Sequence, residues 1–507
     1  MPKSPCVYIV GAGPGDPGLM TVRGLRRLET ADVVVYDHHI HARLLRSARA
    51  DAEQIDVGPA APRPLDQDAI SLLLVEKARE GKTVVRLKWG DPFLFDSGGK
   101  EAIFLHEQQI PFEVIPGVPA TVAVPAYAGI PLTYPGAGEV VTLVRGHEGE
   151  STELPPAEWD RLAGIDGTLV CYAAAPQVGT IVAALLAHGH SGDETAAIIY
   201  DGTTSAQQTV VAPLSQIAAS ARPRGAGMLV VGRVVGLREH LRWFDDRPLF
   251  GRRIVVTRSR EQAADFVDML EERGAETIQL PTIRIAPPDD PDGLDRAAAA
   301  AAGYDWIVFT SANAVDAFFG RLLQCADVRE LKGVRLCAVG PSTAQHISRF
   351  GVRVDLVPDE SRSEGVLEVL AAAGPLQGTR ILLPRADIAR EALPDQLRDA
   401  GAEVTEVVAY RTILAGPERH GDHDVYRMLL DRQIDAVTFT SASTVRSFAR
   451  LLGEEQAADL LNTTVVAAIG PVTAEAAQQL GIRVGVMPKK YTIPDLVDAL
   501  MEHFASS

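Results

Sequence analysis

The stretch VYIVGAGPGDPG (Val7–Gly18) places a short apolar strand directly before a loop of glycines and prolines. Gly11 and Gly13 fit the start of a dinucleotide-binding fingerprint, but Asp16 occupies the position of its third glycine. Two prolines, Pro14 among them, make the loop rigid. The glycines would let the backbone approach a ligand, whereas Asp16 would oppose a phosphate. Such loops also serve as plain turns, so this one alone leaves the function open.

Further loops of the same kind follow other strands of the first half. Each carries glycines or prolines directly after an apolar, β-branched segment, and loops at strand ends of one sheet build a single ligand cleft. In order, the four loops lie within GAGPGDPG (Gly11–Gly18), RLKWGDPFLFDSGGKE (Arg86–Glu101), VIPGVPATVAVPAYAGIPLTY (Val114–Tyr134) and YDGTTSAQQ (Tyr200–Gln208). Each is a weak signal, but the ordered set predicts a ligand site.

Short strands alternate with helical patterns along the whole chain, which is typical of an α/β protein. After a predicted strand at Leu229–Val235, the charged segment RWFDDRPLFGRR (Arg242–Arg253) interrupts the pattern. A new strand at Ile254–Arg258 restores it. We therefore expect a linker here, with a domain boundary near residue 248.

The second half contains a duplication. Each copy has a Thr-Ser pair after one apolar strand and a Gly-Pro pair after the next. In chain order these pairs are Thr310-Ser311, Gly340-Pro341, Thr440-Ser441 and Gly470-Pro471, with one common offset between the copies. The copies span about 251–375 and 378–507, and two copies are too few for a solenoid. They predict two similar lobes with a cleft between them.

Composition narrows the possible functions. The 507 residues carry a formal net charge of −17, and only 6% are aromatic, which argues against nucleic-acid and anionic-membrane partners. The four cysteines are scattered, and His38, His39 and His41 lack a zinc-ligand spacing, so we expect neither a disulfide framework nor a metal. No apolar run reaches membrane-spanning length, and the first strand is too short for a signal peptide. A cytoplasmic protein is expected.

With VVVYD (Val33–Asp37) added, the four loops resemble the tetrapyrrole methylases, and within them uroporphyrinogen-III C-methyltransferase, over about residues 5–240. The resemblance implies two α/β lobes that bind S-adenosylmethionine and transfer its methyl group to a ring carbon. It implies a homodimer through this domain and makes Asp37 the proton acceptor. The residues that it assigns to the cofactor are Pro14, Trp89, Gly90, Asp91, Leu94, Ala120, Ala173 and Gly202.

The first half also departs from that family's pattern. Trp89 replaces the first glycine of L-K-G-G-D-P, and Phe95-Asp96-Ser97-Gly98-Gly99 lacks the arginine of F-G-R-G-G. Pro59 stands where the family has a lysine proton donor, and Ala173 where it has a methionine. Fewer cations should weaken the binding of a substrate with many carboxylates. The departures motivate an alternative in which this half is a non-catalytic, degenerate module.

The duplicated Thr-Ser pairs predict a site in the second half. Ser311 and Ser441 are good helix caps, and helix N-termini offer free N–H groups to anions. Capping alone would explain one copy, but two copies on facing lobes suggest a carboxylate-binding cleft. Arg258 and Arg385 follow the first strands of the two repeats and could add cationic contacts. Tyr410 lies in VVAYRTI, and its plainer interpretation is a half-buried strand tyrosine.

Over about residues 250–507 the chain resembles uroporphyrinogen-III synthase, through VTRSREQA, VFTSANAV, AVGPSTA, VAYRT, FTSAST and IGPVTA. The resemblance implies two flavodoxin-like α/β lobes joined by a two-strand hinge. In that family Tyr410 would assist departure of a hydroxyl, and Ser311, Ser441 and Thr473 would line the cleft. The expected domains and lobes are 1–247 and 248–507, the latter with lobe one at about 251–285 plus 413–507 and lobe two at about 288–409.

The two resemblances support each other, because the product of the second half is the substrate of the first. Our hypothesis is a fused enzyme that closes hydroxymethylbilane to uroporphyrinogen III, with inversion of ring D and loss of water. It then methylates that ring to precorrin-2, on the route towards sirohaem and corrinoids. Two other classes stay open: a nicotinamide-dependent oxidoreductase built on Gly11–Gly15 and Asp37, and a two-lobed binding protein, which the lack of a signal peptide disfavours.

Overall fold

The computed structural model shows an α/β protein, as the sequence predicts. Its described residues form four sheets. Its chain forms two compact units, and each is described by itself. The first unit comprises Met1–Ile254, Phe266–Thr277 and Val497–Ser507, and the second Val255–Asp265 and Ile278–Leu496. The residues described are 6–37, 40–59, 61, 64–146, 157–221, 226–258, 260–280, 283–358, 363–387, 392–414 and 424–506.

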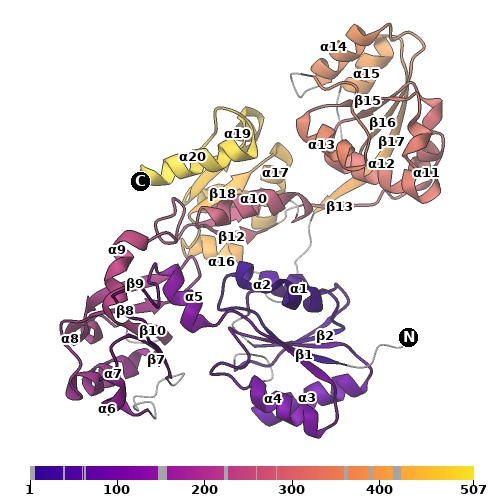
Figure 1. Cartoon of the computed structure of the whole chain (residues 1–507). Helices are drawn as coiled ribbons and strands as arrows, with labels where there is room; N and C mark the ends of the chain where they lie inside the picture. The colour runs from indigo at the N-terminus through magenta and orange to yellow at the C-terminus, as the bar shows by residue number, and fades with distance from the viewer. Residues whose placement is uncertain are drawn as a thin grey trace. The chain divides into compact units, whose positions relative to one another are not determined.

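The first sheet of the first unit is parallel, with strand order β3-β2-β4-β1-β5. Helices cover both of its faces, which explains why its strands are runs of buried β-branched residues. Figure 1 shows α1 and α2 on one face and α3 and α4 on the other. The elements are β1 (Val7–Gly11), α1 (Val22–Leu28), β2 (Val33–Tyr36), α2 (Ala42–Arg46), β3 (Glu53–Asp56), α3 (Gln67–Arg79), β4 (Val84–Lys88), α4 (Gly98–Glu107) and β5 (Phe112–Ile115).

The second sheet of this unit is mixed, with order β6-β7-β10-β8-β9. Only β6 and β7 pair in parallel; the other neighbours are antiparallel. One face packs against α6 and α7, and the other against α5. The elements are α5 (Ala120–Tyr127), β6 (Val141–Arg145), α6 (Trp159–Leu162), β7 (Thr168–Ala174), α7 (Ala175–Ala187), β8 (Thr195–Tyr200), β9 (Gln208–Pro213), α8 (Leu214–Ile217), β10 (Ala226–Val231) and α9 (Arg238–Leu241).

The strand predicted at Leu229–Val235 is shorter than expected. It ends at Val231, because Gly232 adopts a φ of 147° that no strand accommodates, and a 3-10 turn follows.

The segment predicted as a linker is packed. Phe244 and Leu249 are buried, and the ring centroids of Tyr127 on α5 and Phe244 lie 4.7 Å apart. The indole N–H of Trp243 donates to the carbonyl oxygen of Ala126 at 2.9 Å. The charges, Pro248 and Gly251 suggested a linker, but the aromatic residues of this segment bury apolar surface and hold it against α5.

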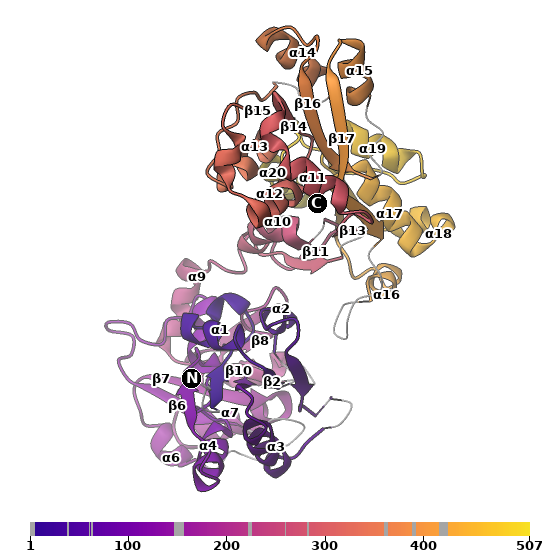
Figure 2. The ribbon, with the colours of Figure 1, turned by 90° about the vertical axis from the view of Figure 1, so that its right-hand side faces the viewer.

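The second unit contains a five-stranded sheet of order β13-β17-β16-β14-β15, parallel except for the edge strand β13. Helices α11, α12 and α13 cover one face, and α14 and α15 the other (Figures 1 and 2). The elements are β13 (Ile283–Ala286), α11 (Asp292–Ala299), β14 (Trp306–Phe309), α12 (Ala312–Cys325), β15 (Arg335–Ala338), α13 (Pro341–Arg349), α14 (Ser363–Ala373), β16 (Arg380–Ala386), α15 (Leu393–Asp399) and β17 (Glu403–Leu414).

The fourth sheet has order β12-β11-β18-β19, so it joins strands from both ends of the second half. The boundary between the two units runs through β11, α10, β12 and α20. The domain limits predicted from the sequence stay a prediction. The elements are β11 (Arg253–Val256), α10 (Arg260–Glu272), β12 (Glu276–Gln279), α16 (Val425–Leu430), β18 (Ala436–Phe439), α17 (Ala442–Leu452), α18 (Glu454–Leu461), β19 (Val465–Ala468), α19 (Pro471–Gln478) and α20 (Ile493–Ala505).

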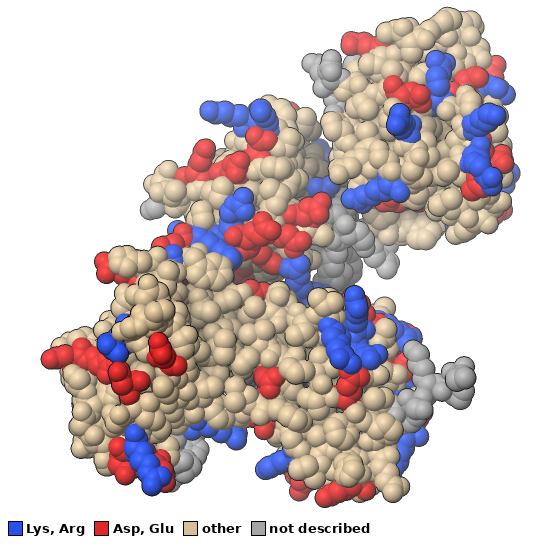
Figure 3. All heavy atoms as spheres, viewed as in Figure 1, with Lys and Arg blue, Asp and Glu red and all other residues tan. Residues whose placement is uncertain are grey.

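The distribution of surface charge and the polarity of the helices bear on the kinds of partner that the protein can have. On the face drawn in Figure 3, acidic and basic side chains lie in small mixed groups without a broad basic patch. Within the described part of the chain, no helix is both long and apolar enough to cross a bilayer.

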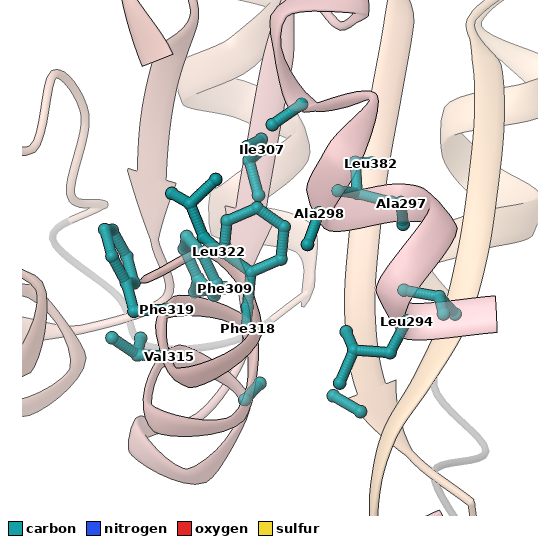
Figure 4. Close-up of a cluster of buried hydrophobic side chains, with 14 of the residues drawn as sticks. Leu294, Ala297, Ala298, Ile307, Phe309, Val315, Phe318, Phe319, Leu322 and Leu382 are labelled. Atoms are coloured by element: carbon teal, nitrogen blue, oxygen red, sulfur yellow. The ribbon is translucent and has the colours of Figure 1, made fainter. Parts of the chain in front are cut away.

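The core between α12 and the five-stranded sheet of the second unit gives a stability prediction (Figure 4). Phe318 on α12 is fully buried, with its ring 5.6 Å from that of Phe309 and 5.7 Å from that of Phe319. Phe318→Ala should lower the free energy of unfolding by about 3–5 kcal/mol, because it leaves a cavity. Leu323→Ala, on the same helix but 48% exposed, should change it by less than about 0.5 kcal/mol. Urea unfolding followed by circular dichroism measures both, and equal effects would contradict the described packing.

Candidate functional site

Three loops meet through their backbones at the carboxyl edge of the first sheet. The N–H of Gly13 donates to the carbonyl oxygen of Gly90 at 3.2 Å, and the N–H of Gly90 donates to that of Gly13 at 2.9 Å. A Cβ on Gly11 would lie 2.5 Å from the nitrogen of Gly117 and 2.6 Å from the oxygen of Gly90. Carboxyl ends of parallel strands share one edge of a sheet, so the loops after β1, β4 and β5 converge. Only glycine fits this junction.

Asp91 ties two of these loops together. Its Oδ2 accepts from the N–H of Gly117 at 3.0 Å, and its Oδ1 accepts from the N–H of Phe93 at 2.9 Å. Gly90 has a φ of 68°, which lets the chain turn before Asp91. Both residues were assigned to the cofactor; the structure places them at the glycine junction and shows that Asp91 also shapes it.

The loop after β8 reaches the loop after β1. The Oγ1 of Thr203 accepts from the N–H of Asp16 at 3.2 Å, and the Oδ2 of Asp16 accepts from the hydroxyl of Tyr127 at 2.7 Å. Burial, followed by this carboxylate, raises the pKa of Tyr127. A Cβ on Gly202 would lie 2.5 Å from a methyl group of Val124, so this turn packs closely on α5. Loops of both sheets are therefore held together around α5.

Trp89 lies between the two sheets of this unit. It packs against a core cluster of each, and its ring centroid is 5.9 Å from that of Tyr172. The next residue on β7, Ala173, points the other way, into the core under α7. Any contact of Ala173 with a ligand near Tyr172 would thus come from its backbone.

The other positions assigned to the cofactor belong to the same group of loops. Pro14 and Ala120 are buried, and Leu94 is half-buried in the loop after β4. Whether these residues bind a cofactor stays a prediction. Pro59, at the position of the family's lysine, is exposed.

Asp37 lies beside two buried cations that the sequence analysis did not single out. The Nη2 of Arg86 donates to its Oδ1 at 2.5 Å, and the Nζ of Lys88 is 3.9 Å from its Oδ2. Both cations are 1% exposed and also contact Glu101 on α4, which is fully buried. Burial would lower the pKa of Arg86, but Glu101 and Asp37 outweigh it and the net direction is upward.

A signal for these cations exists in the sequence. Arg86 and Lys88 are two residues apart on β4, a central strand, so their side chains lie on one face of a sheet covered on both sides. A buried cation needs a partner, so a carboxylate near the end of a neighbouring strand could have been expected. Asp37, directly after β2, is such a carboxylate.

Of the three histidines considered as ligands, the structure describes only His41; His38 and His39 lie outside the described residues. The Nδ1 of His41 accepts from the N–H of Arg43 at 3.1 Å and so caps α2. Burial lowers its pKa. Within the described ranges, no three His, Cys, Asp or Glu side chains lie close enough together to hold a metal ion.

In the second unit the structure brings Tyr410 and Ser311 together. The hydroxyl of Tyr410 on β17 lies 3.1 Å from the Oγ of Ser311. Ser311 also accepts from the N–H of Ala314 and caps α12. Opposite Tyr410 the register shifts between Arg385 and Ala386, a bulge that alters where side chains point. The 9% exposed Tyr410 is therefore held at the end of the sheet by a hydroxyl partner.

The arginines of this half differ in their surroundings. Arg385 donates to Glu406 at 2.5 Å, and Glu406 also accepts from Arg398 at 2.6 Å, so the charge of Arg385 is balanced within its lobe. Arg258 is half-buried, and burial lowers its pKa. Substrate binding by either residue stays a prediction.

The second copy of the Thr-Ser pair is also a cap. The Oγ of Ser441 accepts from the N–H of Thr444 at 3.3 Å at the start of α17. Thr473 lies in the first turn of α19 and is buried. Helix starts thus lie at the carboxyl ends of β18 and β19, where their free N–H groups suit an anion.

Comparison with known families divides the chain in two. Residues 6–218 match the Tetrapyrrole (Corrin/Porphyrin) Methylases, and residues 264–498 match Uroporphyrinogen-III synthase HemD. Both resemblances seen in the sequence are thereby confirmed, and so is the predicted fold class. The protein is an enzyme in which a methyltransferase domain precedes a synthase domain.

One relative aligns over nearly the whole chain, and another over 72% of it. The "Porphyrin biosynthesis protein HemD" of Ruminiclostridium josui is 34% identical over 98% of this chain and 97% of its own. The "Uroporphyrinogen-III C-methyltransferase" of Bacillus subtilis is 33% identical over 72% of this chain and 76% of its own. The chain belongs to the HemD family of porphyrin biosynthesis proteins, with a tetrapyrrole methylase domain joined to a uroporphyrinogen-III synthase domain.

Other similar proteins cover about half of this chain. The "Siroheme synthase" of Neisseria meningitidis serogroup B is 44% identical over 47% of this chain, and this chain spans about half (50%) of that protein. A uroporphyrin-III C-methyl transferase of Thermus thermophilus, solved with S-adenyl homocysteine, is 33% identical over 45% of this chain and 92% of its own, with a TM-score of 0.39.

The glycine junction gives a second prediction. A Cβ on Gly117 would lie 2.2 Å from the carbonyl oxygen of Gly90, so Gly117→Ala forces backbone atoms apart. We expect a loss of about 1–3 kcal/mol in the free energy of unfolding, as for other overpacked sites. The control is Gly179→Ala on α7, where a Cβ meets nothing within 4 Å and helix propensity should rise by up to about 1 kcal/mol. Thermal unfolding compares the two, and an unchanged melting temperature for Gly117→Ala would refute the described contact.

Proposed function

We propose that the chain catalyses two successive reactions. The synthase half closes hydroxymethylbilane to uroporphyrinogen III with inversion of ring D and loss of water. The methylase half then transfers two methyl groups to that ring and yields precorrin-2. The observation that carries the proposal is the presence of both family matches in one chain that aligns end to end with a single relative.

The residues of the first unit fit S-adenosylmethionine, which supplies the methyl group when it is bound. At the glycine junction a Cβ on Gly90 would meet only the nitrogen of Ala120, 3.8 Å away, so the backbone there can approach a ligand. Pro14, Trp89, Asp91, Leu94, Ala173 and Gly202 would complete the cofactor site. Homodimerisation through this domain is part of the proposal.

Asp37 is the proposed proton acceptor. Methylation of a ring carbon leaves a cation that must lose a proton, and a carboxylate can take it. Arg86 holds Oδ1 of Asp37, whereas Oδ2 has no hydrogen bond to any residue in the described part of the chain. With the side chain 27% exposed, Oδ2 is the oxygen that would take the proton.

Tyr410 is the proposed acid of the synthase half. The reaction needs a hydroxyl to leave hydroxymethylbilane and the resulting carbocation to be captured in one orientation. A phenol held by Ser311 can donate a hydrogen bond to the departing oxygen. Backbone N–H groups at the helix starts near Ser311, Ser441 and Thr473, together with Arg258 and Arg385, would hold the carboxylates of the substrate.

The first test of this function is a product analysis. Freshly prepared hydroxymethylbilane is incubated with the protein under anaerobic conditions, with and without S-adenosylmethionine, and products are resolved by isomer and mass. We expect the type III ring without the cofactor and a dimethylated product with it. The type III ring in both reactions would refute the methylase half and favour a degenerate module. Only the spontaneous type I isomer would refute the synthase half.

A substitution tests the role of Tyr410. Tyr410→Phe keeps the buried ring but loses the hydroxyl, so the rate of type III formation should fall about ten-fold or more. Tyr426→Phe is the matched control, because the hydroxyl of Tyr426 bonds only to Gln456 among the contacts described and its side chain is 40% exposed. A wild-type rate for Tyr410→Phe would remove this residue from the mechanism.

A further inference from the structure

The cluster of charged side chains around Asp37 contains more carboxylates than cations. Its cations are Arg86 and Lys88 on β4, and its carboxylates are those of Asp37, Asp96 and Glu101. The Oε2 of Glu101 is buried without a hydrogen-bond partner among the described residues. Three carboxylates therefore share two cations, and each carboxylate competes for an N–H donor.

The N–H donors of Lys88 point to partners other than Asp37. Its Nζ lies 3.1 Å from the Oδ1 of Asp96, 3.2 Å from the Oε1 of Glu101 and 3.1 Å from the Oγ of Ser97. An ammonium group has three N–H donors, and these three acceptors match that number. The Oδ2 of Asp37, 3.9 Å away, is beyond hydrogen-bond distance.

Asp96 is the partner that decides this arrangement. Its side chain is partly exposed, at 24%, and it follows Phe95, whose φ of 59° makes a sharp turn in the chain. Burial raises the pKa of Asp96, and the charge of Lys88 opposes that shift. Glu101 also contacts Arg86, so Asp96 is the carboxylate of this group whose recorded ion pair is with Lys88 alone.

We propose that Asp96 is a positioning residue for methyl transfer: it draws Lys88 away from Asp37 and so keeps the Oδ2 of Asp37 free to accept the proton of the substrate. The inference rests on the proposed role of Asp37. In that step the ring C–H bond breaks, its electron pair returns to the ring system, and the proton binds Oδ2. The described charged groups that contact or surround Asp37 are Arg86 and Lys88 from β4, Glu101 from α4 and Asp96 from the intervening loop.

The experiment compares Asp96→Asn with Ser97→Ala in the full-length protein. Asp96→Asn removes the negative charge beside Lys88 but keeps an acceptor oxygen, whereas Ser97→Ala removes a neutral acceptor of Lys88. In Asp96→Asn, Lys88 should close on Asp37 and make it a weaker base. Single-turnover methyl transfer should then slow by about three- to ten-fold at neutral pH, and the acidic limb of its pH profile should move down by about one unit. The KM for S-adenosylmethionine should stay unchanged.

Two further variants sharpen the result. Ser97→Ala should retain the wild-type pH profile, and Asp96→Glu should restore most of the rate because it keeps the charge. A wild-type profile for Asp96→Asn, or an equal shift for Ser97→Ala, would overturn the inference.

A second readout does not depend on methyl transfer. The carboxyl carbons of ¹³C-labelled aspartates are titrated by NMR, with Asp37→Asn used to assign the Asp37 signal. A lower pKa of Asp37 in Asp96→Asn supports the inference, and an unchanged pKa overturns it. If the wild-type protein transfers no methyl group, the proposed function of this half fails, while the titration still decides the link between Asp96 and Asp37.

Discussion

Burying two cations in the central strand β4 is costly unless each is paired, and this requirement organises the first sheet. Arg86 and Lys88 need carboxylates within reach, and these come from three separate segments: the end of β2, the loop after β4 and the start of α4. The same pairing positions Asp37 at the carboxyl edge of the sheet, next to the glycine junction. Stability and the proposed proton transfer to Asp37 therefore depend on one set of ion pairs.

In the synthase half, neutral hydroxyl groups position a candidate site residue, as the ion pairs do in the first sheet. Its helix caps, Ser311 and Ser441, satisfy backbone N–H groups that would otherwise be unpaired. The hydroxyl of Ser311 also forms a hydrogen bond with the hydroxyl of Tyr410. Ser311 thus both caps α12 and contacts the tyrosine proposed as the acid, so its substitution would affect the helix start and the proposed catalysis together.

Much of this architecture could be predicted from the chain alone. Runs of β-branched residues identified strands such as β1, β2 and β11, and the duplicated Thr-Ser pairs marked equivalent helix starts. The packing of Phe244 and Leu249 and the bulge beside Arg385 could not be predicted, because each depends on residues distant in sequence. The end of β10 had a local signal in Gly232, which the sequence analysis did not use. The ion pairs of Arg86 were missed for another reason: hydrophobic periodicity identified the strand but gave no weight to the charges within it.

The packed segment between the halves has a consequence for how such proteins can be divided. Phe250 lies against Phe244, whose ring in turn lies against Tyr127, and Leu249 is fully buried. A cut at residue 248 would separate Phe250 from Phe244 and expose the apolar surface that these two rings bury against each other. The two halves of this protein are therefore not joined by a free linker that could be replaced. A recombinant protein that receives a different second half must keep the residues up to and including Phe250 together with its first half.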